Sequence, residues 1–470
     1  MMIQNQNKSQ DINQRMLVLE MLLTENVYSH VLVRDVLNKY DYLPQQEKAF
    51  IKRLYEGTLE RQIELDHVID QYSKVKTNKM KKPIRAIMRM STYQILYMDA
   101  VPDAAACNEA VKLVQKKGFA TLKGFVNGVL RNIARGKDDI VYTSLSVKYS
   151  MPEWIVDLWT AQLGAETTER VLAGLLEEHP VTIRFRDAPD TTEIETEEAI
   201  RAVQRVIIAQ GGTMERYTEL PLSHVYRVSG TDDLAKLPYY GNGAFVVQDV
   251  SSMLAVMAVG IEDYVARRGC GYGSKAVKVI DLCAAPGGKS MLTADILEKC
   301  DVGYAVDARD ISARKVGLMQ ENFDRCSLKH ISAEVGDAVM RDDAFIGAAD
   351  FVIADVPCSG LGVIGKKRDI KYKVTPEAVK EITILQKQIL KMAVTYLKPG
   401  GRLLFSTCTI NQEENEEHFR WLIDEMKLKP VSLDDTLPEC LHTDTTSQGY
   451  LQLLPGIHDT DGFFISVLTL

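Results

Sequence analysis

The 470-residue sequence lacks any run of about 18 uncharged apolar residues, the length that a membrane-spanning helix needs. Its opening stretch, MMIQNQNKSQDINQR, lacks the apolar segment of a secretory signal. These two absences predict a cytoplasmic protein with no membrane partner. Hydrophobic residues make up 46% and charged residues 26% of the chain, which is typical of soluble globular proteins.

Paired cysteines are also missing. The eight cysteines are scattered, without a C-x-x-C pair or a neighbouring histidine cluster. This pattern argues against a disulfide framework and against a structural zinc site. We therefore expect reduced thiols and no metal.

The sequence has neither a Walker loop nor a correctly placed G-x-G-x-x-G. Gly269–Gly273 (GCGYG) imitates a phosphate loop, but it precedes the apolar run Ala276–Leu282 instead of following a strand. A dinucleotide fingerprint needs a strand, then a glycine turn, then a helix. The glycine-rich stretch is therefore predicted to be a flexible loop, and dinucleotides and nucleoside triphosphates are disfavoured.

The chain is long enough for two or three domains. Apolar residues recur at helical spacing from Met16 to Arg135, which predicts an all-α domain over residues 1–140 with six or seven helices. Residues 141–250 mix helical and strand patterns and predict a small α+β adaptor. From residue 251 to 470 strands alternate with helices, which predicts a doubly wound, mostly parallel sheet.

Charge is distributed unevenly along the chain. Residues 1–140 hold 22 Lys and Arg against 16 Asp and Glu, whereas residues 141–470 hold 34 against 48. The densest cationic stretch is Lys74–Arg89, which is suited to contacts with phosphates of a nucleic acid. An ordinary solvated helix surface explains the same residues equally well.

Three successive strands of the last domain are predicted to end in features that suit a nucleotide-like cofactor. The first opens into Asp281–Ser290 (DLCAAPGGKS), where Gly287 and Gly288 let a ligand approach a helix N-terminus. Asp307 is expected to end the second strand, where an acid commonly binds ribose hydroxyls, and Asp337 to end the third, near an adenine amine. A helix cap or a solvated turn is the alternative for each acid alone.

Two further apolar runs end in cysteines. Asp350–Gly362 (DFVIADVPCSGLG) carries Cys358 beside Asp355, and Phe405–Thr409 (FSTCT) carries Cys408. If both runs are parallel strands, their carboxyl ends place two thiols at the ligand-binding edge of the sheet. A thiolate that adds to carbon 6 of a pyrimidine makes carbon 5 nucleophilic enough to accept a methyl group, and an acid such as Asp355 stabilises the adduct.

A free cysteine in an α/β protein is more often a small buried residue than a nucleophile. We apply that interpretation to the five cysteines that lie outside the motifs around Cys283, Cys358 and Cys408, namely Cys107, Cys270, Cys300, Cys326 and Cys440. Enzymes that methylate amino groups typically carry an acid or asparagine, two prolines and an aromatic residue at this position, and Pro357-Cys358 departs from that pattern.

The first domain resembles the NusB-like RNA-binding domain. The resemblance rests on Glu47–Asp66, on Val101–Val114 with Asn108-Glu109-Ala110-Val111, and on Gly124–Asn132 with Asn127-Gly128-Val129-Leu130. It covers nearly the whole of this domain, and it implies that the domain binds RNA.

The last domain resembles the RNA cytosine-5 methyltransferase family. The matching motifs are DLCAAPGGKS, Ala354–Val363 (ADVPCSGLGV), Phe405–Glu416 (FSTCTINQEENE) and Asp461–Phe464 (DGFF), preceded by Val247–Ser252. This resemblance implies a Rossmann-like class I methyltransferase fold. It implies S-adenosylmethionine as the methyl donor, bound by Cys283, Ala284, Ala285, Pro286, Gly287, Gly288, Lys289, Asp307, Asp337 and Asp355.

The same resemblance assigns the catalytic roles. It makes Cys408 the nucleophile and Cys358 the thiol that helps to release the product, with Asp355 and Lys289 at the base. The sequence departs from the family before Asp369-Ile370-Lys371, where two basic residues and a proline are usual but Gly365–Arg368 stands here. That departure concerns contacts to the RNA backbone.

The two resemblances together imply methylation of carbon 5 of a cytosine in 16S ribosomal RNA by a monomeric enzyme. Transfer RNA or another RNA is the alternative substrate. An RNA-binding assembly factor with a vestigial methyltransferase core is the alternative from another class, and the intact Asp355, Cys358 and Cys408 argue against it.

Overall fold

The computed structural model describes residues 13–25, 27–177, 180–187, 191–231, 233–267 and 276–470. The chain forms two compact units. The helical unit combines Met1–Leu176 with Lys366–Lys373, and the sheet unit combines Glu177–Gly365 with Val374–Leu470. The predicted division at residues 140 and 250 stays a prediction, and the glycine-rich stretch Gly269–Gly273 lies outside the described residues.

The helical unit confirms the predicted all-α domain. Its helices as far as residue 136 are α1 (Gln14–Leu23), α2 (Ser29–Lys39), α3 (Gln45–Glu60), α4 (Gln62–Tyr72), α5 (Lys82–Tyr97), α6 (Asp103–Lys116) and α7 (Lys123–Gly136), with single 3₁₀ turns at Thr77–Lys79, Ala120–Leu122 and Lys137–Asp139. Pro83 lies in the first turn of α5, where its missing N–H has no helical partner to lose. Three further helices follow: α8 (Leu145–Lys148), α9 (Glu153–Leu163) and α10 (Ala165–Gly174).

A segment from much later in the chain folds with the helical unit. Within Lys366–Lys373, which includes α16 (Ile370–Lys373), Asp369 accepts hydrogen bonds from Ser29 N at 3.0 Å and Ser29 Oγ at 2.6 Å. It thereby caps the N-terminus of α2, which lacks a cap from its own side chains. Lys371 Nζ donates to the carbonyl oxygen of Glu60 at 2.7 Å, at the C-terminus of α3. The Asp369 carboxylate at the N-terminus of α2 and the Lys371 amino group at the C-terminus of α3 each have the sign of charge that the helix dipole favours there, while burial lowers the pKa of Lys371 to about 7.

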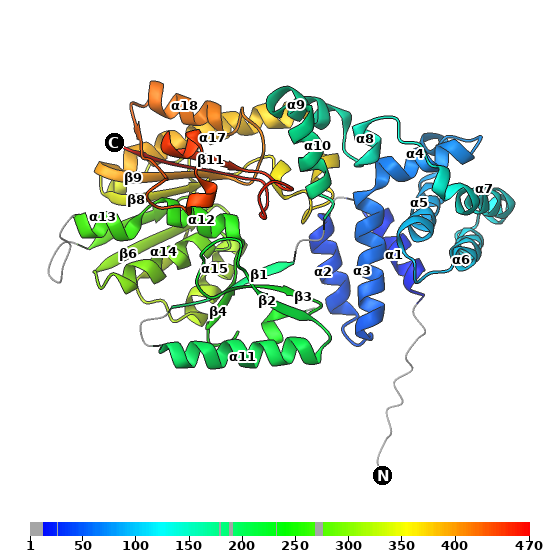
Figure 1. Cartoon of the computed structure of the whole chain (residues 1–470), viewed down its shortest axis with the longest axis horizontal. Helices are drawn as coiled ribbons and strands as arrows, with labels where there is room; N and C mark the ends of the chain where they lie inside the picture. The colour runs from blue at the N-terminus through cyan, green and yellow to red at the C-terminus, as the bar shows by residue number, and fades with distance from the viewer. Residues whose placement is uncertain (1–12, 26, 178–179, 188–190, 232, 268–275) are drawn as a thin grey trace, which may run out of the picture. The chain divides into compact units, whose positions relative to one another are not determined.

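The sheet unit begins with a small antiparallel sheet of order β2-β3-β1-β4. Its elements are β1 (Val181–Phe185), α11 (Glu193–Ala209), β2 (Thr213–Arg216), β3 (Val225–Ser229) and β4 (Phe245–Val247). Helix α11 starts with a capping box in which Thr192 and Glu195 satisfy each other's backbone N–H groups. Figure 1 shows this helix running beside the small sheet, against which it packs Ala199, Val203 and Ile207.

The rest of the sheet unit is a second, larger sheet of order β10-β12-β9-β8-β5-β6-β7, with β11 paired to β12. Its elements are α12 (Val250–Ala258), α13 (Ile261–Arg267), β5 (Val277–Asp281), α14 (Gly288–Lys299), β6 (Tyr304–Asp310), α15 (Ala313–Arg325), β7 (Ile331–Val335), β8 (Ala349–Asp355), α17 (Pro376–Tyr396), β9 (Leu397–Thr407), α18 (Glu416–Asp424), β10 (Lys429–Pro430), α19 (Asp444–Ser447), β11 (Tyr450–Leu453) and β12 (Phe463–Thr469). The strands β5 to β9 are parallel, and β12 is antiparallel to β9. The predicted doubly wound sheet is confirmed.

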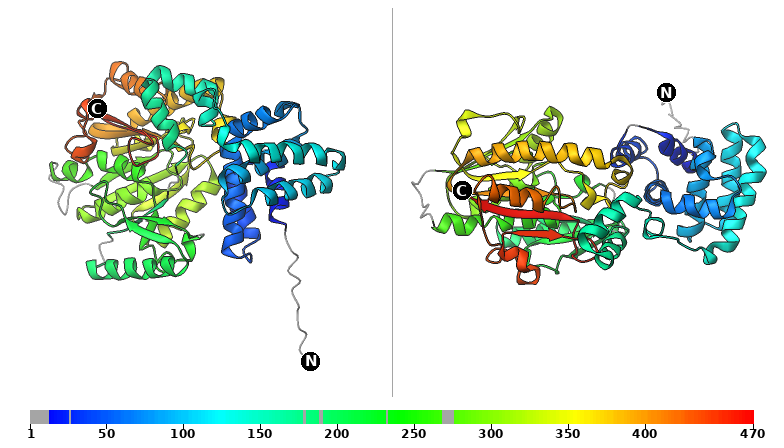
Figure 2. Two further views of the ribbon diagram at one scale, coloured as in Figure 1. Left: turned by 45° about the vertical axis from the view of Figure 1, so that its right-hand side comes forward. Right: turned by 90° about the horizontal axis from the view of Figure 1, so that it is seen from above.

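Helices cover both faces of the larger sheet because its strands are apolar on both sides. Ile280, Val352 and Leu403 face a core shared with α17 and α18, whereas their neighbours Val279, Phe351 and Leu404 face a core shared with α12, α14 and α15. This alternation is the period of two expected for strands. In Figure 2, the view from above shows α17 lying along one face of the sheet.

One local prediction differs from the structure. The second strand does not end at Asp307, because β6 continues to Asp310. Among the described residues, every helix is too short or too polar to cross a membrane.

Candidate active site

The site lies at the carboxyl ends of the parallel strands. Strand β5 has β6 as its neighbour on one side and β8 on the other. Strands β6 and β7 extend the sheet in one direction and β8 and β9 in the opposite direction, so the strand order reverses between β5 and β8. Ligands of open α/β sheets bind at such a switch point. The predicted residues Cys283–Lys289 follow β5, Asp355 ends β8 and Cys358 follows it, so all of them lie at this edge, while their roles there stay predictions.

The loop after β5 ends in a helix N-terminus, as predicted. Helix α14 starts at Gly288, and its N-cap, Gly287, has a φ of +99°. A Cβ atom on Gly287 would lie 2.8 Å from the Phe323 ring, so both conformation and space require glycine here. The first backbone N–H groups of α14 are therefore available to a ligand.

Asp281, at the end of β5, is a site residue that the sequence analysis did not select. Its Oδ2 accepts a hydrogen bond from Ser290 Oγ at 2.6 Å, but its buried Oδ1 has no hydrogen-bond partner among the described residues. Burial raises the pKa of Asp281 to about 7. A cationic ligand group at Oδ1 would satisfy this oxygen and favour the ionised carboxylate.

Lys289 and Asp355, predicted separately, form one ion pair. Lys289 Nζ donates to Asp355 Oδ2 at 2.6 Å and lies 5.0 Å from the centre of the Phe463 ring. Ser406 Oγ donates to the other carboxylate oxygen of Asp355 at 2.8 Å. The pair thus presents an ammonium donor and a carboxylate acceptor side by side, held by groups from three strands and one helix.

The two predicted cysteines also meet. Cys358 Sγ and Cys408 Sγ are 3.2 Å apart, within hydrogen-bonding distance for sulfur. The interaction with Cys408, followed by burial, raises the pKa of Cys358 well above its ordinary value. Cys358 therefore remains a neutral thiol at neutral pH and can donate a hydrogen bond to a sulfur that carries charge.

The other cysteines in the described residues lie apart from this pair. Cys107 and Cys326 are buried, as expected of small core residues, while Cys300 is partly buried and Cys440 is exposed. Burial, together with the charges of Asp281, Asp355 and Asp310, raises the pKa of Cys283. Cys283 follows β5, so it lies at the same edge of the sheet as these three carboxylates, each of which ends a strand.

Asp307 does not lie where it was expected. Along β6 the side chains of Val306, Ala308 and Asp310 alternate with those of Asp307 and Arg309, so Asp307 and Asp310 lie on opposite faces of the sheet. Arg309 donates to Asp307 at 2.6 Å and to Asp342 at 2.9 Å. Asp307 therefore joins an ion-pair network three residues before the end of β6, level with Ile280 near the end of β5, and its contact with ribose hydroxyls stays a prediction.

Asp310 takes the position that was predicted for Asp307. It ends β6, is largely buried, and accepts a hydrogen bond from Ser312 N at 3.0 Å. The adjacent Arg309 carbonyl accepts from Ala284 N at 2.7 Å, which ties the end of β6 to the loop after β5. Extending the strand to its end, three residues beyond Asp307, would have identified Asp310.

Asp337 follows β7 at the same edge of the sheet, as predicted. Its side chain is exposed, and Oδ1 accepts a hydrogen bond from Val339 N at 3.1 Å. This is the geometry of a capped turn, so its contact with an adenine amine stays a prediction.

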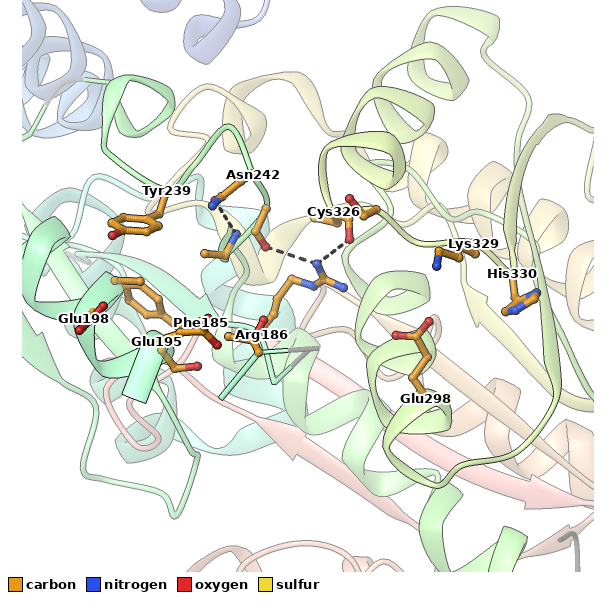
Figure 3. A pocket seen from close by; sticks show the side chains of 16 residues that line it. Phe185, Arg186, Glu195, Glu198, Tyr239, Asn242, Glu298, Cys326, Lys329 and His330 are labelled. Atoms are coloured by element: carbon orange, nitrogen blue, oxygen red, sulfur yellow. Dashed lines mark hydrogen bonds between the residues drawn. The ribbon is translucent and has the colours of Figure 1, made fainter. Parts of the chain in front are cut away.

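A cavity of about 760 Å³ opens elsewhere in the sheet unit, between α11 and the ends of α14 and α15. Figure 3 shows Tyr239, Glu195 and Glu198 on one side of it and Glu298, Lys329 and His330 on the other. Arg186 at its floor donates to both oxygens of Asp295 and to the Cys326 carbonyl at 2.8 Å. None of the predicted site residues lines this cavity. The Arg186 guanidinium already donates its hydrogen bonds to acceptors of the protein.

The cationic stretch Lys74–Arg89 is only partly free. Arg89 donates to Asp66 and to Gln62, and Lys82 pairs with Glu25. Lys74, Lys76, Lys79 and Lys81 are exposed. Arg368, from the stretch that departs from the family pattern, donates to Glu56 at 2.8 Å and to Glu60 at 3.0 Å, so it is engaged within the helical unit.

Two family models match the chain. The model described as 16S rRNA methyltransferase RsmB/F matches residues 274–469, and that of the NusB family matches residues 13–135. The probable ribosomal RNA small subunit methyltransferase B of Bacillus subtilis is 32% identical over 448 residues, which are 93% of this chain and 94% of that protein. A protein of the same description from Synechocystis is 28% identical over 460 residues, 96% of this chain and 97% of that protein.

Solved structures show the same fold. The crystal structure of PH0851 has a TM-score of 0.74 at 22% identity and covers 97% of this chain and 98% of that one. The crystal structure of NSun6 from Pyrococcus horikoshii with SFG has a TM-score of 0.52 at 21% identity and covers 68% of this chain and 98% of that one.

The family matches and the curated relatives, together with the fold, identify an S-adenosylmethionine-dependent RNA methyltransferase that carries a NusB helical domain. The chain belongs to the RsmB/F family of 16S rRNA methyltransferases.

Proposed function

We propose that this enzyme methylates carbon 5 of a cytosine in 16S ribosomal RNA through a transient bond between Cys408 Sγ and carbon 6 of the base. One observation carries the proposal: the Cys358 and Cys408 sulfurs are 3.2 Å apart at the ends of two neighbouring strands, beside the Lys289–Asp355 pair. Methylation of an amino group needs no thiol, whereas methylation of carbon 5 requires a nucleophile to activate the ring.

The residues around the loop after β5 fit S-adenosylmethionine. The unpartnered Asp281 Oδ1 suits the ammonium group of the methionine part, and the buried carboxylate of Asp310 suits ribose hydroxyls. The N-terminus of α14 suits the donor's carboxylate, because its free N–H groups and the helix dipole both favour an anion. When bound, S-adenosylmethionine supplies an electrophilic methyl carbon.

Addition of Cys408 is the step that activates the base. The thiolate forms the bond to carbon 6, and the electron pair of the ring double bond moves into the enamine system of carbon 5, carbon 4 and nitrogen 3. The Lys289 ammonium donates to an acceptor atom of the ring, and the Asp355 carboxylate accepts from the exocyclic amine. Carbon 5 then attacks the methyl carbon as the bond from that carbon to the donor's sulfonium sulfur breaks, which leaves a neutral thioether.

Release of the product reverses the addition. A water molecule accepts the proton from carbon 5, the electron pair of that C–H bond restores the double bond between carbons 5 and 6, and the bond to Cys408 Sγ breaks with the sulfur departing as a thiolate. The neutral Cys358 thiol, 3.2 Å away, stabilises this departing charge by donating a hydrogen bond. Its raised pKa keeps the proton available at neutral pH.

The helical unit is proposed to hold the RNA. Its exposed lysines Lys74, Lys76, Lys79 and Lys81 suit sequence-independent contacts with phosphates. A cytosine must leave its stack before Cys408 can reach carbon 6, which favours a loop or a disrupted helix as the target. The family of the chain and the names of its relatives support 16S ribosomal RNA as the substrate.

Methyl transfer to defined RNAs tests this function. The purified chain is expected to transfer a labelled methyl group to unmodified 16S RNA, to leave transfer RNA unlabelled, and to bind 16S RNA less tightly as salt rises. Bisulfite sequencing of the product should show one protected cytosine. Label on transfer RNA alone would change the substrate, and label on 16S RNA without a protected cytosine would overturn the carbon-5 chemistry.

The donor site can be tested at Asp310 and Asp307. Asp310→Asn is expected to weaken S-adenosylmethionine binding about tenfold or more, because a charge-assisted hydrogen bond to a ribose hydroxyl contributes about 1.5–3 kcal/mol. Asp307→Asn is the matched control on the opposite face of β6 and should leave the dissociation constant unchanged. Calorimetric titration measures both, and a weakened Asp307 variant beside an unchanged Asp310 variant would reverse the assignment.

A further inference from the structure

Glu414 is a buried carboxylate between the end of β9 and the start of α18, and no role is assigned to it by the proposed chemistry. Its side chain is fully buried, at 0% exposure, although no lysine or arginine pairs with it among the described residues. A buried charge is tolerated only when hydrogen bonds replace its water. The donors around Glu414 therefore show what the carboxylate holds in place.

The donors come from both cysteine loops. Ser359 donates to Glu414 through its backbone N at 2.8 Å and its Oγ at 2.6 Å. From the other loop, Asn411 Nδ2 donates at 3.2 Å and Thr409 Oγ1 lies at 3.5 Å. Ser359 directly follows Cys358 and Thr409 directly follows Cys408, so the carboxylate joins the residues adjacent to the two sulfurs.

Gln386 of α17 completes the arrangement. Its Nε2 donates to Glu414 at 3.1 Å and to the Pro357 carbonyl at 2.8 Å, so Cys358 is fixed on both sides along the chain. The hydroxyls of Ser359 and Thr409 are also 2.7 Å apart, which closes the network between the loops. A carboxylate that accepts hydrogen bonds from both loops links the residues beside the two sulfurs and so limits the separation of the loops.

We propose that Glu414 is a positioning residue for product release: it holds the Cys358 thiol against Cys408 Sγ by joining Ser359 to Thr409 and Asn411. The inference rests on the proposed function, since it assumes a bond between Cys408 and the base. The charge of Glu414 also contributes to the raised pKa of Cys358, which agrees with a role in keeping that thiol protonated.

Glu414→Gln tests the inference with almost no change in volume. The new amide nitrogen is a donor and replaces an oxygen that accepted hydrogen bonds from Ser359, Gln386 or Asn411. Two donors then face each other, the hydrogen bond is lost, and one of the two loops is no longer held. The covalent enzyme–RNA adduct is expected to persist about tenfold longer than in the wild type, while the dissociation constant for S-adenosylmethionine stays unchanged. Denaturing gels of quenched single turnovers measure the lifetime of the adduct.

Glu417→Gln is the matched control. Glu417 is exposed in the first turn of α18, three residues from Glu414, and its variant should release the product at the wild-type rate. Ser359→Ala removes only the Oγ donor and leaves the backbone N, so a smaller slowing of release is expected. If thermal melting shows that Glu414→Gln does not fold, the Ser359→Ala variant becomes the test. Product release by Ser359→Ala at the wild-type rate would then overturn the proposal.

A double variant separates positioning of Cys358 from a general structural effect. If Glu414 acts through the Cys358 thiol, Cys358→Ala with Glu414→Gln should retain the adduct no longer than Cys358→Ala alone. An added effect would show that Glu414 acts elsewhere and would overturn the inference. Wild-type methyl transfer by a Cys408→Ala variant would instead contradict the proposed covalent function, so the two failures are distinguishable.

Discussion

Cys408→Ala is expected to abolish methyl transfer, with a loss of about 10⁴-fold or more in the single-turnover rate constant, the order lost when a covalent nucleophile is removed. Carbon 5 of cytosine is a poor nucleophile, and the remaining Lys289–Asp355 pair polarises the ring without supplying the electron pair that addition at carbon 6 provides. Transfer of labelled methyl groups to 16S RNA measures the loss.

Binding should survive this substitution. Cys408 follows β9, whereas the proposed donor site is built by β5, β6 and the N-terminus of α14, so the dissociation constant for S-adenosylmethionine is expected to remain that of the wild type. Cys440→Ala is the matched control, because Cys440 is exposed and far along the chain from both strand ends. A Cys408 variant with wild-type activity would overturn the proposed mechanism outright.

The sequence predicted positions best where a reactive side chain directly follows an apolar strand. Cys358 and Cys408 were expected at neighbouring strand ends, and the structure brings their sulfurs to 3.2 Å. The pattern works because strands β8 and β9 are apolar on both faces and parallel, so their lengths and carboxyl ends can be located from the hydrophobic runs. The loop after β5 was located for the same reason.

The sequence was weaker where polar residues continue a strand. Tyr304–Asp310 reads as apolar only as far as Val306, and Asp307 looks like its end. In the structure Arg309 pairs with Asp307, and the strand continues beside β7 to Asp310. A hydrophobic pattern does not reveal that a charged residue inside a strand forms an ion pair with a residue two positions away. Such a residue is therefore read as the end of the strand.

Long-range polar contacts were missed for a related reason. Asp369 caps α2 from 340 positions along the chain, and Ser359 meets Glu414 across 55 positions. Capping boxes are readable because donor and acceptor are three residues apart, as in Thr192 and Glu195. No local spacing predicts which distant carboxylate satisfies a helix end, so the basic stretch before Asp369 was interpreted only in terms of RNA.

Cys358→Ala is expected to stop the reaction after a single turnover. The addition at carbon 6 and the methyl transfer need only Cys408 and the base-binding pair, so a burst of about one methyl group per enzyme should form at a rate near that of the wild type. Without the thiol hydrogen bond the departing Cys408 sulfur loses its nearest proton donor, and release should slow about 10²-fold, the lower range for acid catalysis.

The stalled species should be visible as a covalent complex. Denaturing gels are expected to show one RNA per Cys358→Ala enzyme, sensitive to nuclease, whereas the double variant that also lacks Cys408 should show none. Cys358→Ser retains a hydrogen-bond donor at the same position and should release its RNA faster than the alanine variant. If Cys358→Ala instead turns over many times without a complex, the release step does not need this thiol, and the short distance between the two sulfurs would reflect packing of the strand ends alone.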